Sequence, residues 1–278
     1  MSDPSTQFLQ RALEIATEAA LAGGAILQTY AGKVEAREKG RPGDLVTVAD
    51  RAAEAAILQV IQRHFPDHAI LAEESGSQGT RSSELLWAID PLDGTTNYAH
   101  QYPFYACSIG LLIAGVPQVG VIFDPNRGDL FRAATGLGAT CNRQPIQVSP
   151  TPTLRQSLLV TGFAYDRWET PDNNYAEFCA LTHLTQGVRR GGAASIDLAY
   201  VACGKLDGYW ERGLSPWDLA AGVVIVTEAG GTVTAYDQSP FAIETGRILA
   251  TNGAIHAELS QELLKIQPLP PDCLPRSS

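Results

Sequence analysis

The chain has 278 residues, a formal net charge of −10 and a sequence pI of about 4.9. This length allows one large domain or two coupled halves. The negative charge disfavours nonspecific binding to nucleic acid or to an anionic membrane, and it repels a phosphate substrate unless cations lie in the site. We therefore expect no nucleic-acid partner and no membrane partner.

The cysteines and the N-terminus indicate a cytoplasmic protein. The five cysteines are odd in number and form no Cys-x-x-Cys motif, which argues against a disulfide framework and a zinc site. Reduced thiols are typical of the cytoplasm. The N-terminus lacks a basic segment followed by an apolar core, and no apolar run approaches the roughly 20 residues that a membrane helix needs.

The first half of the chain mixes helices with strands. Asp3-Pro4 resembles a helix start, and apolar residues from Leu9 to Ala20 recur at helical spacing. A polar, glycine-rich loop precedes a second helix that opens near Asp50. Buried strands are predicted at 69–71, 85–89 and 130–134, a loop at 75–83, and a hairpin of 107–113 with 116–123.

Pro145 to Pro152 is the predicted boundary between two halves. Strand and helix patterns alternate after it: strands at 158–161, 188, 208–211, 232–234 and 248–250, and helices at 175–185, 194–202, 217–229 and 255–264. This alternation indicates a layered α/β or α+β architecture. We predict one catalytic domain at 1–266, with halves at about 1–150 and 151–266, and a Pro-rich tail at 267–278.

The most informative stretch ends an apolar run with two acids, a glycine and two hydroxyls, at residues 87–97. Asp90 and Asp93 supply anionic oxygen, the ligand that magnesium prefers. Pro91 favours extended backbone at Asp90, so we expect a sharp turn directly after the strand. Gly94 lets the backbone approach an oxyanion, and the hydroxyl of Thr95 can donate and accept a proton. Asp-Pro and Asp-Gly are also common turn dipeptides.

Further acidic residues lie at predicted element ends, where ligands bind in open sheets. Asp50 lies at a helix start, Glu73 and Glu74 follow a strand, and Asp218 opens the helix after Pro216-Trp217. Helix capping is the alternative role for Asp50 and Asp218, and a solvated pair is the alternative for Glu73 and Glu74.

Together these blocks closely resemble the inositol monophosphatase family of magnesium-dependent, lithium-sensitive phosphatases. Its first signature is similar to residues 87–97, and its second to 217–222, continuing to 228–231. Segments 44–50 and 72–75 resemble its two other blocks. The resemblance extends to about Leu264 and implies the αβαβα sandwich of the sugar-phosphatase fold.

The resemblance also implies two to three magnesium ions. Glu73, Asp90 and the Leu92 carbonyl would hold the first ion. Asp90, Asp93 and Asp218 would hold the second, and Glu73 would share a third. Lys39 matches the loop that covers the metals in this family.

The remaining implied roles concern water and substrate. Thr95 and Asp50 would orient and deprotonate the attacking water, and Glu73 counts among the catalytic positions. The amides of Gly94 and Thr95 would bind phosphate. Positions that contact the substrate would be Asp93, Ala194 and Glu211.

The resemblance therefore favours magnesium-dependent hydrolysis of inositol monophosphate, or of a similar small polyol or sugar phosphate. Sister activities remain open, namely fructose-1,6-bisphosphatase, 3'-phosphoadenosine phosphatase and histidinol-phosphatase, because fold and metal residues do not separate them. Glu211 favours a hydroxyl-rich ring. A regulatory binding role in transcription, with Arg189 and Arg190 at the contact, is the alternative from another class. We also expect a homodimer.

Overall fold

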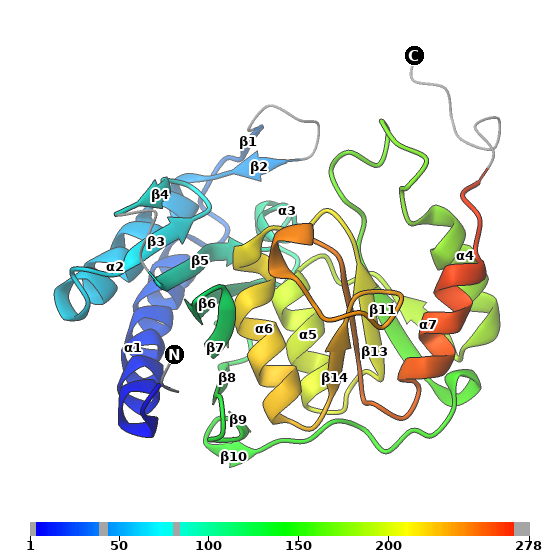
Figure 1. Cartoon of the computed structure of the whole chain (residues 1–278). Helices are drawn as coiled ribbons and strands as arrows, with labels where there is room; N and C mark the ends of the chain where they lie inside the picture. Colours follow the sequence, from blue (N-terminus) through cyan, green and yellow to red (C-terminus); the bar gives the residue numbers. More distant parts are fainter. Residues whose placement is uncertain (1–3, 39–43, 80–83, 270–278) are drawn as a thin grey trace.

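The computed structural model describes residues 4–38, 44–79 and 84–269, which form alternating layers of helices and sheets (Figure 1). Helices α1 (Thr6–Tyr30) and α2 (Val48–His64) cover one face of the first sheet. Helices α5 (Ala194–Ala202) and α6 (Pro216–Glu228) lie between the two sheets. Helices α4 (Tyr175–Leu184) and α7 (His256–Lys265) cover the second sheet from outside. The αβαβα sandwich is confirmed.

The first sheet has eight strands in the order β10-β9-β8-β7-β6-β5-β3-β4. β3 and β5 run parallel, and the other neighbouring pairs run antiparallel. The strands are β3 (Ala69–Ala72), β4 (Gly76–Gln78), β5 (Leu85–Asp93), β6 (Ala106–Ile113), β7 (Val116–Asp124), β8 (Asp129–Ala134), β9 (Ala139–Cys141) and β10 (Gln144–Pro145). A separate pair joins β1 (Arg37–Glu38) to β2 (Leu45–Val46).

The second sheet has five strands in the order β12-β11-β13-β15-β14. β11 runs parallel to both neighbours, whereas β15 runs antiparallel to β13 and β14. The strands are β11 (Leu158–Thr161), β12 (Gly187–Arg189), β13 (Gly208–Glu211), β14 (Thr232–Thr234) and β15 (Ile248–Thr251). Short 3₁₀ helices lie at Leu154–Gln156 and Ile243–Thr245.

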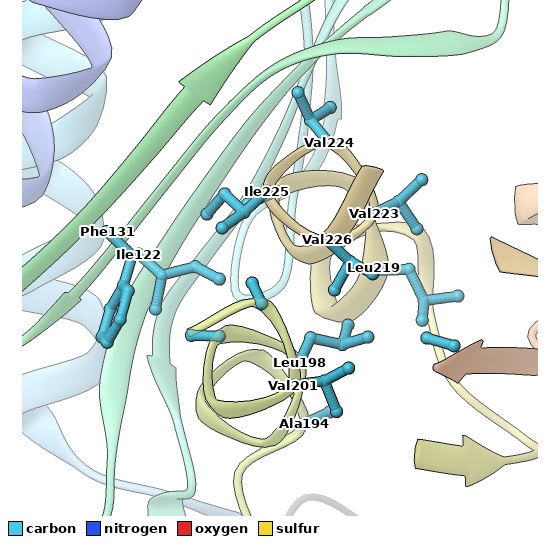
Figure 2. Packing of buried hydrophobic residues seen from close by; sticks show 14 of the residues in the cluster. Ile122, Phe131, Ala194, Leu198, Val201, Leu219, Val223, Val224, Ile225 and Val226 are labelled. Atoms are coloured by element: carbon cyan, nitrogen blue, oxygen red, sulfur yellow. The ribbon is translucent and has the colours of Figure 1, made fainter. Parts of the chain in front are cut away.

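A continuous core joins the two sheets through α5 and α6. Figure 2 shows Leu198 of α5 near Leu219 and Val226 of α6, with Ile122 and Phe131 on the strand side. Small residues let α6 lie directly on the sheet, because a Cβ at Gly110 or Gly120 would collide with Ala220 or Ala221. These two glycines therefore serve packing.

Several short elements differ from the sequence-based expectation. The predicted loop at 75–83 contains β4 within its described part, and β9 and β10 were not predicted. Such two- or three-residue strands depend on long-range pairing and leave little local pattern. No described helix has the length and apolar character needed to span a bilayer. The strands of the first sheet end at Pro145 and those of the second begin at Leu158. The division of one catalytic domain into two halves remains our prediction. Most of the expected Pro-rich tail lies outside the described residues.

Candidate active site

The acidic motif lies at the end of β5, where its pairing with β6 becomes irregular. The register shifts between Asp90 and Asp93, and the strand continues through Pro91. The predicted strand end at Ile89 is therefore wrong: β5 ends at Asp93, and the turn after the strand occurs at Gly94. An irregular register tolerates a proline, which cannot donate a hydrogen bond to the ladder. Gly94 has a φ of 93°, which favours glycine, and it starts α3 (Thr95–Ala99).

Backbone amides anchor both carboxylates of this motif. Asp90 is 3% exposed, and its Oδ1 accepts a hydrogen bond from the Leu92 amide at 2.9 Å. Asp93 accepts from the Ser195 amide at 2.7 Å, the Ser195 hydroxyl at 2.5 Å and the Ala194 amide at 3.2 Å. Asp93 therefore ties the end of β5 to the start of α5. Ser195 was not among the predicted site residues, because its hydrogen-bond partner Asp93 lies 102 positions away along the chain.

The structure brings Thr95 and Asp50 together. The Thr95 hydroxyl donates to Asp50 Oδ1 at 3.1 Å and lies 3.0 Å from the Leu92 carbonyl oxygen. Asp50 Oδ2 accepts from the amide and the hydroxyl of Thr47, at 2.8 and 2.6 Å. Thr47, not Asp50, is the N-cap of α2, and Asp50 completes its capping box. The capping role and the contact with Thr95 thus use different oxygens of one carboxylate.

Asp218 has the corresponding position in α6. Ser215 is the N-cap, and Asp218 Oδ2 accepts from the Ser215 amide at 2.7 Å. Glu73 follows β3, where its amide donates to the Ile89 carbonyl at 3.1 Å. Asp218 and Glu73 are both partly buried. We call Glu73, Asp90, Asp93 and Asp218 the acidic centre.

Burial and neighbouring carboxylates of the acidic centre raise the pKa values of Asp90 and Asp218. Burial raises the pKa of Asp90 well above its usual range, and the charges of Glu73, Asp93 and Asp218 raise it further. Burial and the charges of Asp93 and Glu73 do the same to the pKa of Asp218. The pKa of Asp93 is also raised by burial, although its hydrogen bonds to α5 oppose the shift. A carboxylate beside another negative charge is harder to ionise, so these charges favour the protonated forms of Asp90 and Asp218.

The donor set of the acidic centre fits hard divalent cations. Carboxylate and carbonyl oxygens suit magnesium, and a cation would offset the repulsion among the carboxylates. Among the described residues, however, no three His, Cys, Asp or Glu side chains are arranged to hold an ion as they stand. The carboxylates point partly at amide donors instead. Their oxygen atoms are the ligand type that magnesium prefers. To bind one ion together, the carboxylate side chains would have to rotate toward a common point.

A cavity of about 220 Å³ joins the acidic centre to the second half of the chain. Predicted site residues that line it are Asp93, Gly94, Thr95, Ala194, Glu211 and Asp218. A larger hollow of about 540 Å³ lies at the β6–β7 turn and the end of α6, and none of the predicted site residues lines it. We assign the chemistry to the smaller cavity because the buried acids face it.

Glu211 forms a second acidic wall of this cavity. It is the last residue of β13, it is 7% exposed, and its Oε2 accepts from the Tyr209 hydroxyl at 2.6 Å. Burial raises the pKa of Glu211 to about 7. Asp197 of α5 lines the same cavity and is 1% exposed. We call Tyr209, Glu211 and Asp197 the Glu211 wall. Its carboxyl groups are suited to contact hydroxyl groups of a ligand.

Sequence reasoning missed further residues of the cavity. Tyr165, Arg167 and Asp197 line it but belong to none of the acidic motifs. Asn97 was part of the first motif without a role, and its side-chain amide donates to the carbonyls of Phe104 and Gly191 at 2.7 and 3.0 Å. It therefore holds the loop before α5 against α3. Arg190, considered only as a partner contact, also lines the cavity. Lys39 lies outside the described residues.

Comparison with known proteins identifies the family. Residues 9–267 match the model of the inositol monophosphatase family. This chain belongs to the inositol monophosphatase family. The assignment makes it a phosphatase, a hydrolase of a family that depends on metal ions.

Individual relatives agree over nearly the whole length. The inositol-1-monophosphatase of Synechocystis sp. is 68% identical over 260 residues, which cover 93% of this chain and 91% of the relative. The Nus factor SuhB of Pseudomonas aeruginosa is 41% identical, over 95% of this chain and 98% of the relative. The solved structure of the inositol monophosphatase from Anabaena (Nostoc) sp. is 66% identical, with a TM-score of 0.88, and covers 94% of this chain and 98% of that chain.

Proposed function

We propose that this protein is a magnesium-dependent phosphomonoesterase that hydrolyses inositol monophosphate, or a similar small polyol phosphate, to the alcohol and inorganic phosphate. The observation that carries the proposal is the Thr95–Asp50 hydrogen bond, which lies beside the acidic centre at the cavity that Glu211 also lines. Thr95, two carboxylates of the acidic centre and the carboxyls of the Glu211 wall thus line one cavity, and Asp50 lies behind Thr95 as its hydrogen-bond acceptor. The 68% identical relative from Synechocystis sp. supports the substrate class.

In this proposal the acidic centre binds two to three magnesium ions. Glu73, Asp90 and the Leu92 carbonyl would hold one ion, and Asp90, Asp93 and Asp218 would hold another. Glu73 shares a third. Bound magnesium supplies positive charge that stabilises the phosphate oxygens and promotes ionisation of water. Asp90 belongs to both main ligand sets, so its substitution affects both.

The residues beside the acidic centre position the attacking water. The Thr95 hydroxyl has a single proton, and Asp50 Oδ1 accepts it in a hydrogen bond at 3.1 Å. Thr95 passes this proton to Asp50 as it accepts one from water. The water oxygen attacks phosphorus, the ester P–O bond breaks, and the alcohol takes a proton from solvent. No side chain forms a covalent intermediate. The amides of Gly94 and Thr95 bind the phosphate.

Glu211 and Ala194 contact the alcohol part of the substrate in this proposal. Glu211 Oε2 is taken by Tyr209, which leaves the other oxygen for a ligand hydroxyl. Fructose 1,6-bisphosphate, 3'-phosphoadenosine phosphate and histidinol phosphate are the competing substrates. A regulatory role in transcription has weaker support, because the Nus factor relatives are less similar than the phosphatase from Synechocystis sp.. The expected homodimer and cytoplasmic location stay predictions.

A panel of phosphorylated metabolites assayed with magnesium tests the proposal. We expect the highest kcat/KM for inositol 1-phosphate, and no turnover after chelation. Above pH 7, where Glu211 is mostly ionised, Glu211→Gln should lower kcat/KM for inositol 1-phosphate by about tenfold, since a hydrogen bond to a charged group is lost. A higher kcat/KM for one of the competing substrates would assign a sister activity, and turnover in metal-free protein would refute the metal assignment.

A further inference from the structure

Asp197 is a buried acid with an unsatisfied oxygen. Its side chain is 1% exposed, yet its Oδ1 has no hydrogen-bond partner among the described residues. Buried polar groups nearly always have a partner, and leaving one without costs the folded state free energy. A residue that is unfavourable for folding is best explained by a function, and Asp197 lines the cavity of the active site.

A glycine leaves room for the carboxyl group of Asp197. A Cβ at Gly191 would collide with Asp197 Oδ1 and with the Phe104 ring. Glu211 is packed in the same way, because a Cβ at Gly162 would collide with its carboxylate. Two carboxyl groups from different elements, α5 and β13, therefore line one cavity, each against a glycine that has no side chain to displace it.

The charges in this part of the cavity are close to one another. Burial raises the pKa of Asp197 well above its usual range, and the charges of Glu211 and Asp93 raise it further, while Arg190 opposes the shift. Arg190 also lines the cavity. A carboxyl that is easily protonated can both donate to and accept from a hydroxyl group. This suits a neutral, hydroxyl-rich ligand better than a second anion.

We propose that Asp197 is a specificity-determining residue, whose carboxyl hydrogen-bonds a hydroxyl of the polyol leaving group beside the hydroxyl held by Glu211. This inference rests on the proposed function. Two carboxyls on separate elements recognise two hydroxyls of one ring, which a monohydroxy alcohol cannot offer. Asp197 is a binding residue in this scheme and takes no part in proton transfer to the attacking water.

The test compares inositol 1-phosphate with cyclohexyl phosphate, which has a ring of the same size and no ring hydroxyls. Asp197→Ala should lower kcat/KM for inositol 1-phosphate by about tenfold, mainly through KM, and change that for cyclohexyl phosphate by less than about twofold. Asp197→Asn should retain most activity, because the amide keeps a donor and an acceptor. Equal losses on both substrates would overturn the proposal.

Thermal stability gives an independent readout. Asp197→Ala removes an unsatisfied buried oxygen, so Tm should stay unchanged or rise. The matched control is Asp207→Ala, also at a buried acid, since Asp207 accepts from the Ser149 hydroxyl at 2.5 Å and the Leu158 amide at 2.6 Å. The control should lower Tm and leave the ratio of kcat/KM for the two substrates unchanged. A fall in Tm of Asp197→Ala as large as the control's, with an unchanged ratio, would show a structural role instead.

A second variant changes Gly191, which packs against the carboxyl group of Asp197. Gly191→Ala should displace the carboxyl and reproduce the selective loss on inositol 1-phosphate. An unaltered ratio of kcat/KM for the two substrates in folded Gly191→Ala would contradict the proposal.

Wild-type kinetics separate this inference from the proposed function. If the wild-type enzyme shows no preference for inositol 1-phosphate over cyclohexyl phosphate, the proposed polyol substrate is refuted. A wild-type preference that survives Asp197→Ala would refute only the role of Asp197.

Discussion

The acidic centre and the Glu211 wall both place buried carboxyls at one cavity, but they orient them differently. In the acidic centre, Asp90, Asp93 and Asp218 each accept a hydrogen bond from at least one backbone amide. In the Glu211 wall, Glu211 is oriented by the side chain of Tyr209, and Asp197 Oδ1 has no partner in the described part of the chain. Backbone amides fix a carboxylate through the fold itself, whereas a side-chain partner can be replaced by a single substitution.

The difference suggests a division of roles. The acidic centre requires one arrangement for phosphate chemistry, so its orientation depends on element ends that the fold determines. The Glu211 wall contacts the variable part of the substrate, so its hydrogen bonds are partly left to the ligand. Substitutions in the acidic centre should therefore affect all substrates equally, and those in the wall should change the choice among substrates.

The largest effect is expected from Asp90→Asn. The variant should lower kcat by more than the roughly 10²–10³-fold that loss of one electrostatic contact costs, because Asp90 serves both main ions in our proposal. The loss should be equal for inositol 1-phosphate and cyclohexyl phosphate. Steady-state kinetics across a magnesium titration provide the measurement, with Asp237→Asn at an exposed turn as control. Near-normal kcat in Asp90→Asn would show that the acidic centre does not take part in catalysis.

Thr95→Ala and Asp50→Asn should each lower kcat by about 10²–10⁴-fold with little change in KM. Their effects should be non-additive, since the two side chains form one proton path. As a control, Thr227→Ala removes a hydroxyl that donates to the Val223 carbonyl within α6 at 2.8 Å, outside the predicted site, and should leave kcat unchanged. A double variant whose loss equals the product of the single losses would contradict a shared path.

Ser195→Ala tests the link between the acidic centre and α5. Losing the hydroxyl that orients Asp93 should raise the magnesium concentration for half-maximal activity by about 10–100-fold. Ser260 is equally buried and binds the Tyr236 carbonyl at 2.6 Å, so Ser260→Ala is the matched control without a magnesium effect. An unchanged magnesium requirement in Ser195→Ala would show that the Ser195 and Ala194 amides alone hold Asp93.

The smallest effect concerns pH and stability. The pKa values of Asp90 and Asp218 are raised by folding, so the stability from their protonated forms is present below the ordinary value of 3.8 and is lost as pH rises through the raised values. Glu211, with a pKa of about 7, extends the loss to neutral pH. The Tm of chelated protein should therefore fall between about pH 4.5 and 7, by about 2–4 °C per kcal/mol of lost stability. Magnesium should reduce this fall in Tm. A Tm that rises with pH in the presence of chelator would refute the repulsion among the buried carboxylates.

Most of the fold could be predicted from local pattern. The apolar periodicity placed α5 at 194–202 and β13 at 208–211, with the bounds that the structure has. The end of β5 was placed at Ile89 instead of Asp93, because the register shift that carries the strand through Pro91 depends on pairing with β6. The very short strands also escaped prediction, since their hydrogen bonds join distant segments.

The sequence by itself determined the chemistry of this protein: its acidic oxygen donors, the hydroxyl of Thr95, the family to which these motifs belong and the layered arrangement of helices and strands. These properties follow from residue type and local spacing, which are fixed along the chain. Only the tertiary structure decided which groups meet. Asp93 and Ser195 are 102 positions apart, and Thr95 and Asp50 are 45 apart. Spacing cannot specify such contacts. The first forms when α5 packs between the two sheets, and the second forms when α2 packs against β5 of the first sheet.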